Sequence, residues 1–189
     1  MTLETPRLLL RPWRDQDAAD LYALAGDPRV GPAAGWLPHP SPAHSLEIIR
    51  TVLGRPGVFA LELKETGRPV GSVGLLTAPD ANLPLAPGEA ELGYWVGVPC
   101  WGRGLAPEAA RAVLGWGFGP LALSAVWCGW YEGNRQSRRV QEKCGFRWQY
   151  TCRGAVCPAG GPPRTEQVFR LTRQEWLAGA GTPASLSGQ

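Results

Sequence analysis

The chain has 189 residues, 44% of them hydrophobic and 19% charged, so it can bury a core of its own without disulfide bonds. These proportions are typical of a globular protein and exclude a disordered chain. A net charge of +3 without a block of Lys or Arg argues against a nucleic-acid-binding surface. No apolar run approaches the roughly 18 residues that a membrane span needs, so we expect no membrane partner.

The cysteines and histidines argue against a metal site. The five cysteines are irregularly spaced, with no CxxC pair, and the two histidines, His39 and His44, lie far from them in the sequence. We therefore expect no zinc or other metal. The chain does not open on a basic segment followed by a long apolar core, so no secretory signal is visible. Reduced thiols and a cytoplasmic location are expected.

The first half of the chain alternates apolar runs with Gly- and Pro-rich turns. The pair Ser41-Pro42 is typical of a helix start, because a hydroxyl cap precedes proline at the first helical position. In chain order the patterns predict a strand at 7–11, a helix capped by Asp15, a loop at 26–40, a helix opened by Ser41, and a hairpin of strands at 58–64 and 68–76.

The second half continues with strands and helices in alternation. In chain order it predicts a loop at 79–88, a strand at 89–98, a helix at 105–118, a strand at 121–129 and a helix at 136–143. Closing strands at 146–153 and 164–171 follow, and then a short helix opened by a capping box at 172–175. The result is one α+β (mixed α/β) domain over 1–178, with a mostly antiparallel twisted sheet of about seven strands flanked by four or five helices. A flexible tail is expected at 179–189.

The run 101–106 (WGRGLA) lies between a predicted strand and a predicted helix. This arrangement points backbone N–H groups and the positive end of a helix at an anion such as a phosphate. Glycine lets the backbone approach such a ligand closely, so main-chain amides would hold it. By itself, the run is also compatible with a strand-to-helix turn that binds nothing.

A second motif follows about thirty residues later, at 134–146: Asn-x-x-Ser, then Val-x-Glu-Lys-x-Gly-Phe. Together the two motifs resemble the acetyl-CoA site of GNAT-type N-acetyltransferases, and the second is similar to that of the RimJ/RimL-like branch, the ribosomal-protein N-terminal acetyltransferases. The opening residues 3–11 also resemble this branch. The resemblance covers roughly residues 3–176, and its main departure is Trp101, where the family often has Gln or Arg.

The resemblance implies acetyl-CoA as the co-substrate and no metal. In such enzymes the Asn lies near the pantetheine arm and the Ser near the sulfur, so Ser137 would protonate the departing thiolate. A backbone N–H of Trp95 or Val96 would meet the tetrahedral oxyanion. The residues expected to bind the cofactor are Trp95, Val96, Trp101, Gly102, Arg103, Gly104, Leu105, Ala106, Asn134, Ser137, Arg139 and Lys143.

Transfer requires a neutral amine, yet an α-amine with a pKa near 8 is only roughly one-tenth free at neutral pH. A base should therefore help. Glu91 is the candidate because its strand leads into the glycine turn; Glu89, on the same side of the strand, and water are the alternatives. Glu108 is assigned to helix-dipole complementarity and local hydrogen bonding, and Cys144 to no covalent role. Trp36, Trp130 and Tyr131 are candidates for the wall of an acceptor pocket.

The sequence thus favours direct acetyl transfer from acetyl-CoA to a primary amine: a protein N-terminus, an amino acid, a polyamine or an antibiotic. The alternative is a CoA-binding regulatory module of the same fold without transfer activity. An ATP-binding protein is disfavoured because no GxxxxGK[ST] run occurs. The loops at 26–40, 79–88 and 154–163 carry no recognisable chemistry, so the acceptor stays open. Similar enzymes are often dimers, so a homodimer is compatible with the resemblance.

Overall fold

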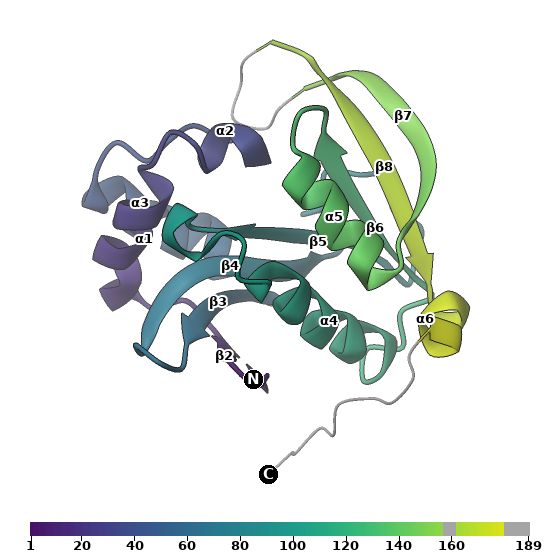
Figure 1. The fold of residues 1–189 in the computed structure, drawn as a ribbon, viewed down its shortest axis with the longest axis horizontal. Helices are drawn as coiled ribbons and strands as arrows, with labels where there is room; N and C mark the ends of the chain where they lie inside the picture. The colour runs from purple at the N-terminus through teal and green to yellow at the C-terminus, as the bar shows by residue number, and fades with distance from the viewer. Residues whose placement is uncertain (157–161, 180–189) are drawn as a thin grey trace.

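The computed structural model describes residues 1–156 and 162–179, in which one eight-stranded sheet carries helices on both faces (Figure 1). The strands are β1 (Leu3–Glu4), β2 (Leu8–Arg11), β3 (Val58–Leu63), β4 (Arg68–Leu76), β5 (Glu89–Val96), β6 (Ala125–Tyr131), β7 (Arg147–Ala155) and β8 (Arg164–Thr172). The helices are α1 (Ala18–Ala25), α2 (Gly31–Ala34), α3 (Pro42–Ile48), α4 (Leu105–Phe118), α5 (Arg135–Cys144) and α6 (Arg173–Gly179).

The sheet has the strand order β1-β2-β3-β4-β5-β6-β8-β7, and every neighbouring pair is antiparallel except β5 and β6. This parallel pair is short: its register runs only from Glu89 opposite Ala125 to Glu91 opposite Trp127. Beyond Glu91 the two strands diverge, as Figure 1 shows. The sheet therefore opens in its middle, at the C-terminal ends of β5 and β6.

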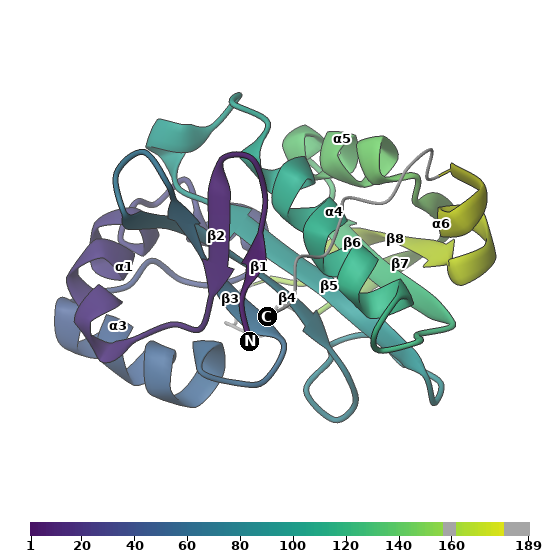
Figure 2. The same ribbon diagram turned by 90° about the horizontal axis from the view of Figure 1, so that it is seen from below.

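Two apolar clusters hold the layers together. The larger one packs α4 against the central strands, burying Ala109, Val113 and Leu114 completely. The smaller one, built around Trp13, Leu21 and Ile49, lies under α1 and α3. Figure 2 shows these two helices side by side at one end of the molecule, with α4 and α5 toward the other. Removal of this apolar surface from water is the main force that fixes the layers.

The structure confirms the α+β class, the hairpin of β3 and β4, and α4 at the predicted residues. It also confirms two caps. The Ser41 hydroxyl accepts a hydrogen bond from the His44 amide at 3.1 Å, and Thr172 and Glu175 exchange the bonds of a capping box. No helix in the described ranges is long and apolar enough to cross a membrane.

Four details differ from the predictions. The strand expected at 121–129 runs from Ala125 to Tyr131. Asp17, not Asp15, accepts the hydrogen bond from the Arg14 amide, because its buried carboxylate is held there by Arg11. The loop expected at 26–40 contains the short helix α2, which Gly35 ends in a left-handed conformation. The additional strand β1 pairs with β2. Most of the tail expected at 179–189 lies outside the described residues.

Candidate active site

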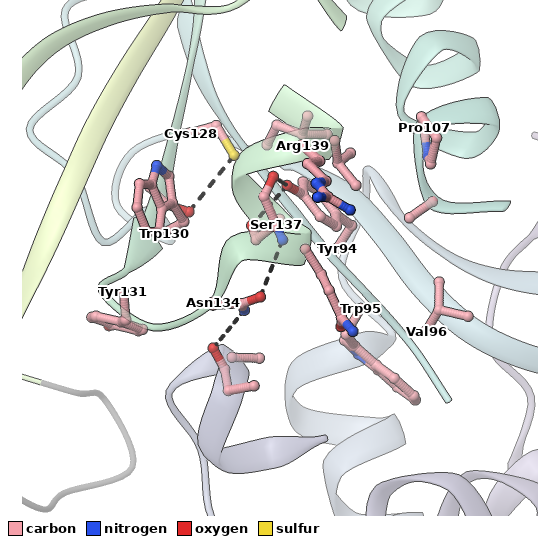
Figure 3. A pocket seen from close by; sticks show the side chains of 18 of the residues that line it. Tyr94, Trp95, Val96, Pro107, Cys128, Trp130, Tyr131, Asn134, Ser137 and Arg139 are labelled. Carbon is pink, nitrogen blue, oxygen red and sulfur yellow. Dashed lines mark hydrogen bonds between the residues drawn. The ribbon is translucent and has the colours of Figure 1, made fainter. Parts of the chain in front are cut away.

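A cavity of about 480 Å³ lies where β5 and β6 diverge. Its walls come from the C-terminal halves of these two strands, the turn before α4, the first turns of α5, and α2. Figure 3 shows side chains of β5, β6 and α5 around the same space. The opening in the sheet thus brings together segments that lie far apart in the sequence.

The glycine turn forms one end of this cavity. Gly102 and Gly104 both have a left-handed backbone, with φ of 75° and 77°, which other residues adopt only at a cost. A Cβ at Gly102 would meet no atom within 4 Å, so conformation rather than crowding requires glycine there. Gly104 is the N-cap of α4, and no side chain of the described residues caps this helix end. Its first amides are therefore available to an anion.

Side chains beside the turn fix it in place. The Trp101 indole N–H donates to the Val96 carbonyl at 2.6 Å, which ties the turn to the end of β5. The Arg103 side chain lies near Glu65 and Cys100, and Arg103 is absent from the described residues that line the cavity. The structure therefore does not bring the Arg103 side chain to the cavity, whereas Arg139 and Lys143 of α5 do line it.

Glu108, in the first turn of α4, anchors the N-terminal segment of the chain. Its carboxylate accepts hydrogen bonds from the Thr5 hydroxyl at 2.7 Å and from Arg7 Nε at 2.7 Å. Burial alone raises the pKa of Glu108, but these bonds outweigh burial and leave its pKa below the usual value. The carboxylate thus joins α4 to the N-terminal segment, about one hundred residues earlier in the sequence. We had expected only local hydrogen bonds.

The start of α5 supplies the hydroxyl expected near the sulfur. Asn134 caps the helix by accepting from the Ser137 amide at 3.1 Å, and its Nδ2 donates to the Ala33 carbonyl of α2 at 2.9 Å. The Ser137 hydroxyl lies 2.8 Å from the Tyr94 hydroxyl, as Figure 3 shows. Tyr94 also donates to the Ser137 carbonyl at 3.0 Å. Both hydroxyls thus face the cavity from adjacent elements.

Tyr94 was not among the residues singled out from the sequence. Burial raises the pKa of its phenol well above the ordinary value, so the group stays protonated at neutral pH. Strand alternation could have indicated it, since Tyr94 points to the face opposite Glu91 and Trp95 on β5. Its pairing with α5 across the gap could not be inferred without the fold.

The backbone of β5 distinguishes between the two expected oxyanion donors. The Gly97 amide donates to Val70 of β4 at 2.8 Å. Amides alternate in direction along a strand, so the Trp95 amide faces β4 and the Val96 amide faces the cavity. This geometry favours Val96.

The two candidate bases on β5 have different surroundings. The Glu91 carboxylate lines the cavity and accepts hydrogen bonds from the Asn82 and Leu83 amides at 2.6 and 3.0 Å. Glu89 lies outside the lining set and forms an ion pair with Arg170 at 2.8 Å. The structure therefore brings Glu91, and not Glu89, to the cavity.

A third carboxylate, Glu166 of β8, also lines the cavity, and sequence reasoning missed it. Its residue lies opposite Tyr131 in the sheet, and its carboxylate occupies the space where a Cβ at Gly129 would be. Burial, and then the negative charge of Glu91, raise the pKa of Glu166. The alternation of β8 offered a weak signal, but only the pairing of β6 with β8 places the residue at the cavity.

The remaining candidates separate into lining and packing residues. Trp130 and Tyr131 line the cavity, whereas Trp36 is outside the lining set and packs against Trp95 with ring centroids 5.7 Å apart. Burial raises the pKa of the Cys144 thiol to about 11, so it is protonated and poorly nucleophilic at neutral pH. In the described part of the chain, no three His, Cys, Asp or Glu side chains converge as metal ligands.

Comparison with known proteins gives consistent results. The family model for the acetyltransferase (GNAT) domain matches residues 7–147. YoaA of Bacillus subtilis, named an uncharacterized N-acetyltransferase, is 27% identical over 176 residues, which cover 90% of this chain and 96% of YoaA. A GNAT-family acetyltransferase from Bacillus anthracis superimposes with a TM-score of 0.81 at 20% identity, covering 93% of this chain and 100% of the other.

A third comparison is with another solved structure. A protein from Vibrio cholerae, provisionally named a ribosomal-protein-serine acetyltransferase, superimposes with a TM-score of 0.74 at 22% identity. The match covers 91% of this chain and 97% of that protein. At this identity, the likeness establishes a shared fold.

Proposed function

Because this chain belongs to the GNAT acetyltransferase family and is an N-acetyltransferase, we propose that its cavity between β5 and β6 is where acetyl-CoA meets a primary amine. The observation that carries this assignment is the glycine turn, whose left-handed Gly102 and Gly104 open the N-terminus of α4 toward the cavity. Main-chain amides at 102–106 would hold the pyrophosphate, and Arg139 and Lys143 would approach the phosphates.

The acetyl group would pass directly from sulfur to nitrogen. The amine attacks the thioester carbonyl, and the Val96 amide stabilises the tetrahedral oxyanion. Glu91 assists removal of the amine proton, directly or through a water. When the C–S bond breaks, Ser137 passes a proton to the thiolate and regains one from solvent, so the proton lost by the amine balances the proton gained by CoA. The hydrogen bond to Tyr94 keeps the Ser137 hydroxyl in place.

Thiol release tests this proposal. Acetyl-CoA is incubated with peptides, amino acids, polyamines and aminoglycosides, and free CoA is measured for the wild type, Glu91→Gln and Ser137→Ala. Glu47→Gln, an exposed site on α3, is the matched control for Glu91→Gln and should keep the wild-type rate. A Glu91→Gln enzyme with the full rate at every pH would show that Glu91 is not the base.

A regulatory module that binds CoA without transfer is the competing function. Binding of acetyl-CoA in equilibrium dialysis, with no thiol released across the whole amine panel, would favour it. The ordered hydroxyl pair and the carboxylates at the same cavity support the enzyme instead.

We further propose an acceptor of the RimJ/RimL type, that is, a protein N-terminus. The motif at 134–146 and the name of the Vibrio cholerae neighbour support this narrower assignment. Peptides with a free N-terminus should be acetylated at the α-amine, as mass spectrometry of the products would reveal, and acetylation confined to a lysine side chain would contradict it. The cytoplasmic location and the homodimer stay predictions.

A further inference from the structure

The charged residues that line the cavity are segregated by sign. The basic pair, Arg139 and Lys143, lies on α5, whereas the acidic pair consists of Glu91 on β5 and Glu166 on β8. In Figure 3, Arg139 projects on the Pro107 side of Ser137, and Trp130 and Tyr131 lie on the other side. The basic pair suits the phosphates of CoA, which leaves the acidic pair for the acceptor.

The two carboxylates are held in different ways. Glu91 is engaged by the amides of Asn82 and Leu83, so it also fixes the loop before β5. Among the described residues, burial and the charge of Glu91, and no hydrogen bond, set the pKa of the Glu166 carboxylate. Glu166 is therefore the carboxylate whose oxygens are open to a ligand.

Gly129 of β6 explains how Glu166 reaches the cavity. The Glu166 carboxylate lies over this glycine, in the volume that any larger residue would fill. Cys128 and Trp130, the residues on either side of Gly129, also line the cavity. The Glu166 carboxylate therefore lies over the part of β6 that forms the cavity wall. The position of the Glu166 carboxylate thus depends on residue 129 of β6 being glycine, which has no side chain.

Two negative charges in a partly buried cavity repel one another. The raised pKa of Glu166, caused by burial and by the charge of Glu91, reflects this cost. A cation between them would relieve the repulsion, whereas a carboxylate would add to it.

We propose that Glu166, together with Glu91, selects acceptors that carry no carboxylate beside the reacting nitrogen, and that Glu166 is the specificity-determining residue. Peptide N-termini, amino-acid amides and diamines satisfy this condition, whereas free α-amino acids do not. The inference rests on the proposed function, since it concerns the acceptor of the same transfer reaction.

The test compares α-amines matched except for the carboxylate beside the reacting nitrogen: alaninamide against alanine, and glycinamide against glycine. The ratio of kcat/KM within each pair is measured by thiol release for the wild type and Glu166→Gln. Intrinsic differences in amine basicity cancel when the ratios are compared between enzymes. We expect a wild-type preference for the carboxylate-free member, which Glu166→Gln reduces roughly tenfold, while the KM for acetyl-CoA stays unchanged.

A second variant moves the charge without deleting it. Gly129→Ala adds a Cβ that displaces the end of the flexible Glu166 side chain, so it should reduce the same preference. Glu47→Gln, which removes an exposed charge on α3, should leave both ratios as in the wild type.

The outcomes separate this inference from the proposed function. Normal turnover with unchanged ratios in Glu166→Gln would overturn the inference alone. No thiol release from any member of a pair or from the peptides of the amine panel, although acetyl-CoA still binds, would overturn the proposed function and the inference with it.

Discussion

The two ends of the cavity are built on different principles. The end assigned to the cofactor is a contiguous turn, 101–107, that acts through backbone conformation and a helix start. The end assigned to the acceptor consists of side chains from segments far apart in the sequence, with Glu91 on β5 and Glu166 on β8. The first is a local property of the chain and the second a product of sheet topology, so substitutions should affect them differently.

The largest effect is expected at the cofactor end. Gly104→Val places a β-branched residue at φ 77°. The turn should then change its conformation, and its amides should no longer point toward one anion. We expect acetyl-CoA binding to weaken by about a hundredfold or more, measured by isothermal titration calorimetry.

A matched control separates backbone strain from loss of the site. Gly67, in the turn between β3 and β4, has φ 66°, and a Cβ added there would meet no atom within 4 Å, as at Gly102. Gly67→Val should therefore lower the free energy of unfolding by about 1–2 kcal/mol and leave cofactor affinity unchanged. Equal loss of affinity in both variants would contradict a specific role for the 101–107 turn.

The next effect concerns the hydroxyl pair where the two ends meet. Ser137→Ala removes the proposed proton donor to sulfur, so kcat should fall roughly a hundredfold with little change in acetyl-CoA affinity. Tyr94→Phe removes only the partner hydroxyl 2.8 Å away and should cost roughly tenfold. Steady-state kinetics with one good acceptor measures both. A larger loss in Tyr94→Phe would instead make Tyr94 the donor.

A smaller effect is expected at Asn134, which joins α5 to α2. Asn134→Ala removes both the cap of α5 and the bond to the Ala33 carbonyl, so it should destabilise the fold by about 1–2 kcal/mol and raise the KM for acetyl-CoA several-fold. Ser41→Ala is the control, because it removes the cap of α3, whose residues lie outside the cavity lining. It should lower stability, measured by urea denaturation, at an unchanged KM.

The smallest effect is a pH dependence at Glu108. Its pKa is lowered from 4.5 in the folded protein, so its contribution is complete above the unfolded pKa and is lost as pH falls through the folded one. Arg7 is 45% exposed, so solvent screens the pair and Glu108→Gln should cost only about 1 kcal/mol at pH 7. Urea denaturation between pH 7 and about pH 3 should show this difference narrowing below about pH 4.5. A constant difference would mean that the charge of Glu108 is irrelevant.

The comparison also explains what could be predicted from the sequence. The turn at 101–106, the helix at 105–118 and the Ser41 cap are set by glycine positions, apolar spacing and capping chemistry, which are local. Each could therefore be predicted from the sequence, and the structure confirms the helix and the cap.

The acceptor end was less accessible for a physical reason. The relation between Glu91 and Glu166 depends on β6 lying between β5 and β8, a non-local pairing that no spacing rule contains. The reach of Glu166 depends further on the bare backbone at Gly129. Likewise, Arg103 stands within the glycine turn in sequence, yet its side chain turns toward Glu65, because φ and χ angles rather than sequence position decide where a long side chain goes.

The three-residue ladder between β5 and β6 has a mechanical consequence. Beyond Glu91, β5 and β6 are no longer paired. Across this gap the two halves of the sheet therefore lack the backbone hydrogen bonds that stiffen an ordinary sheet. An elongated ligand bound in the gap would contact both halves and restrain their relative motion. The amide hydrogens of β5 that face the gap, those of Tyr94 and Val96, should then exchange with solvent more slowly, and the enzyme without ligand should be the more flexible form.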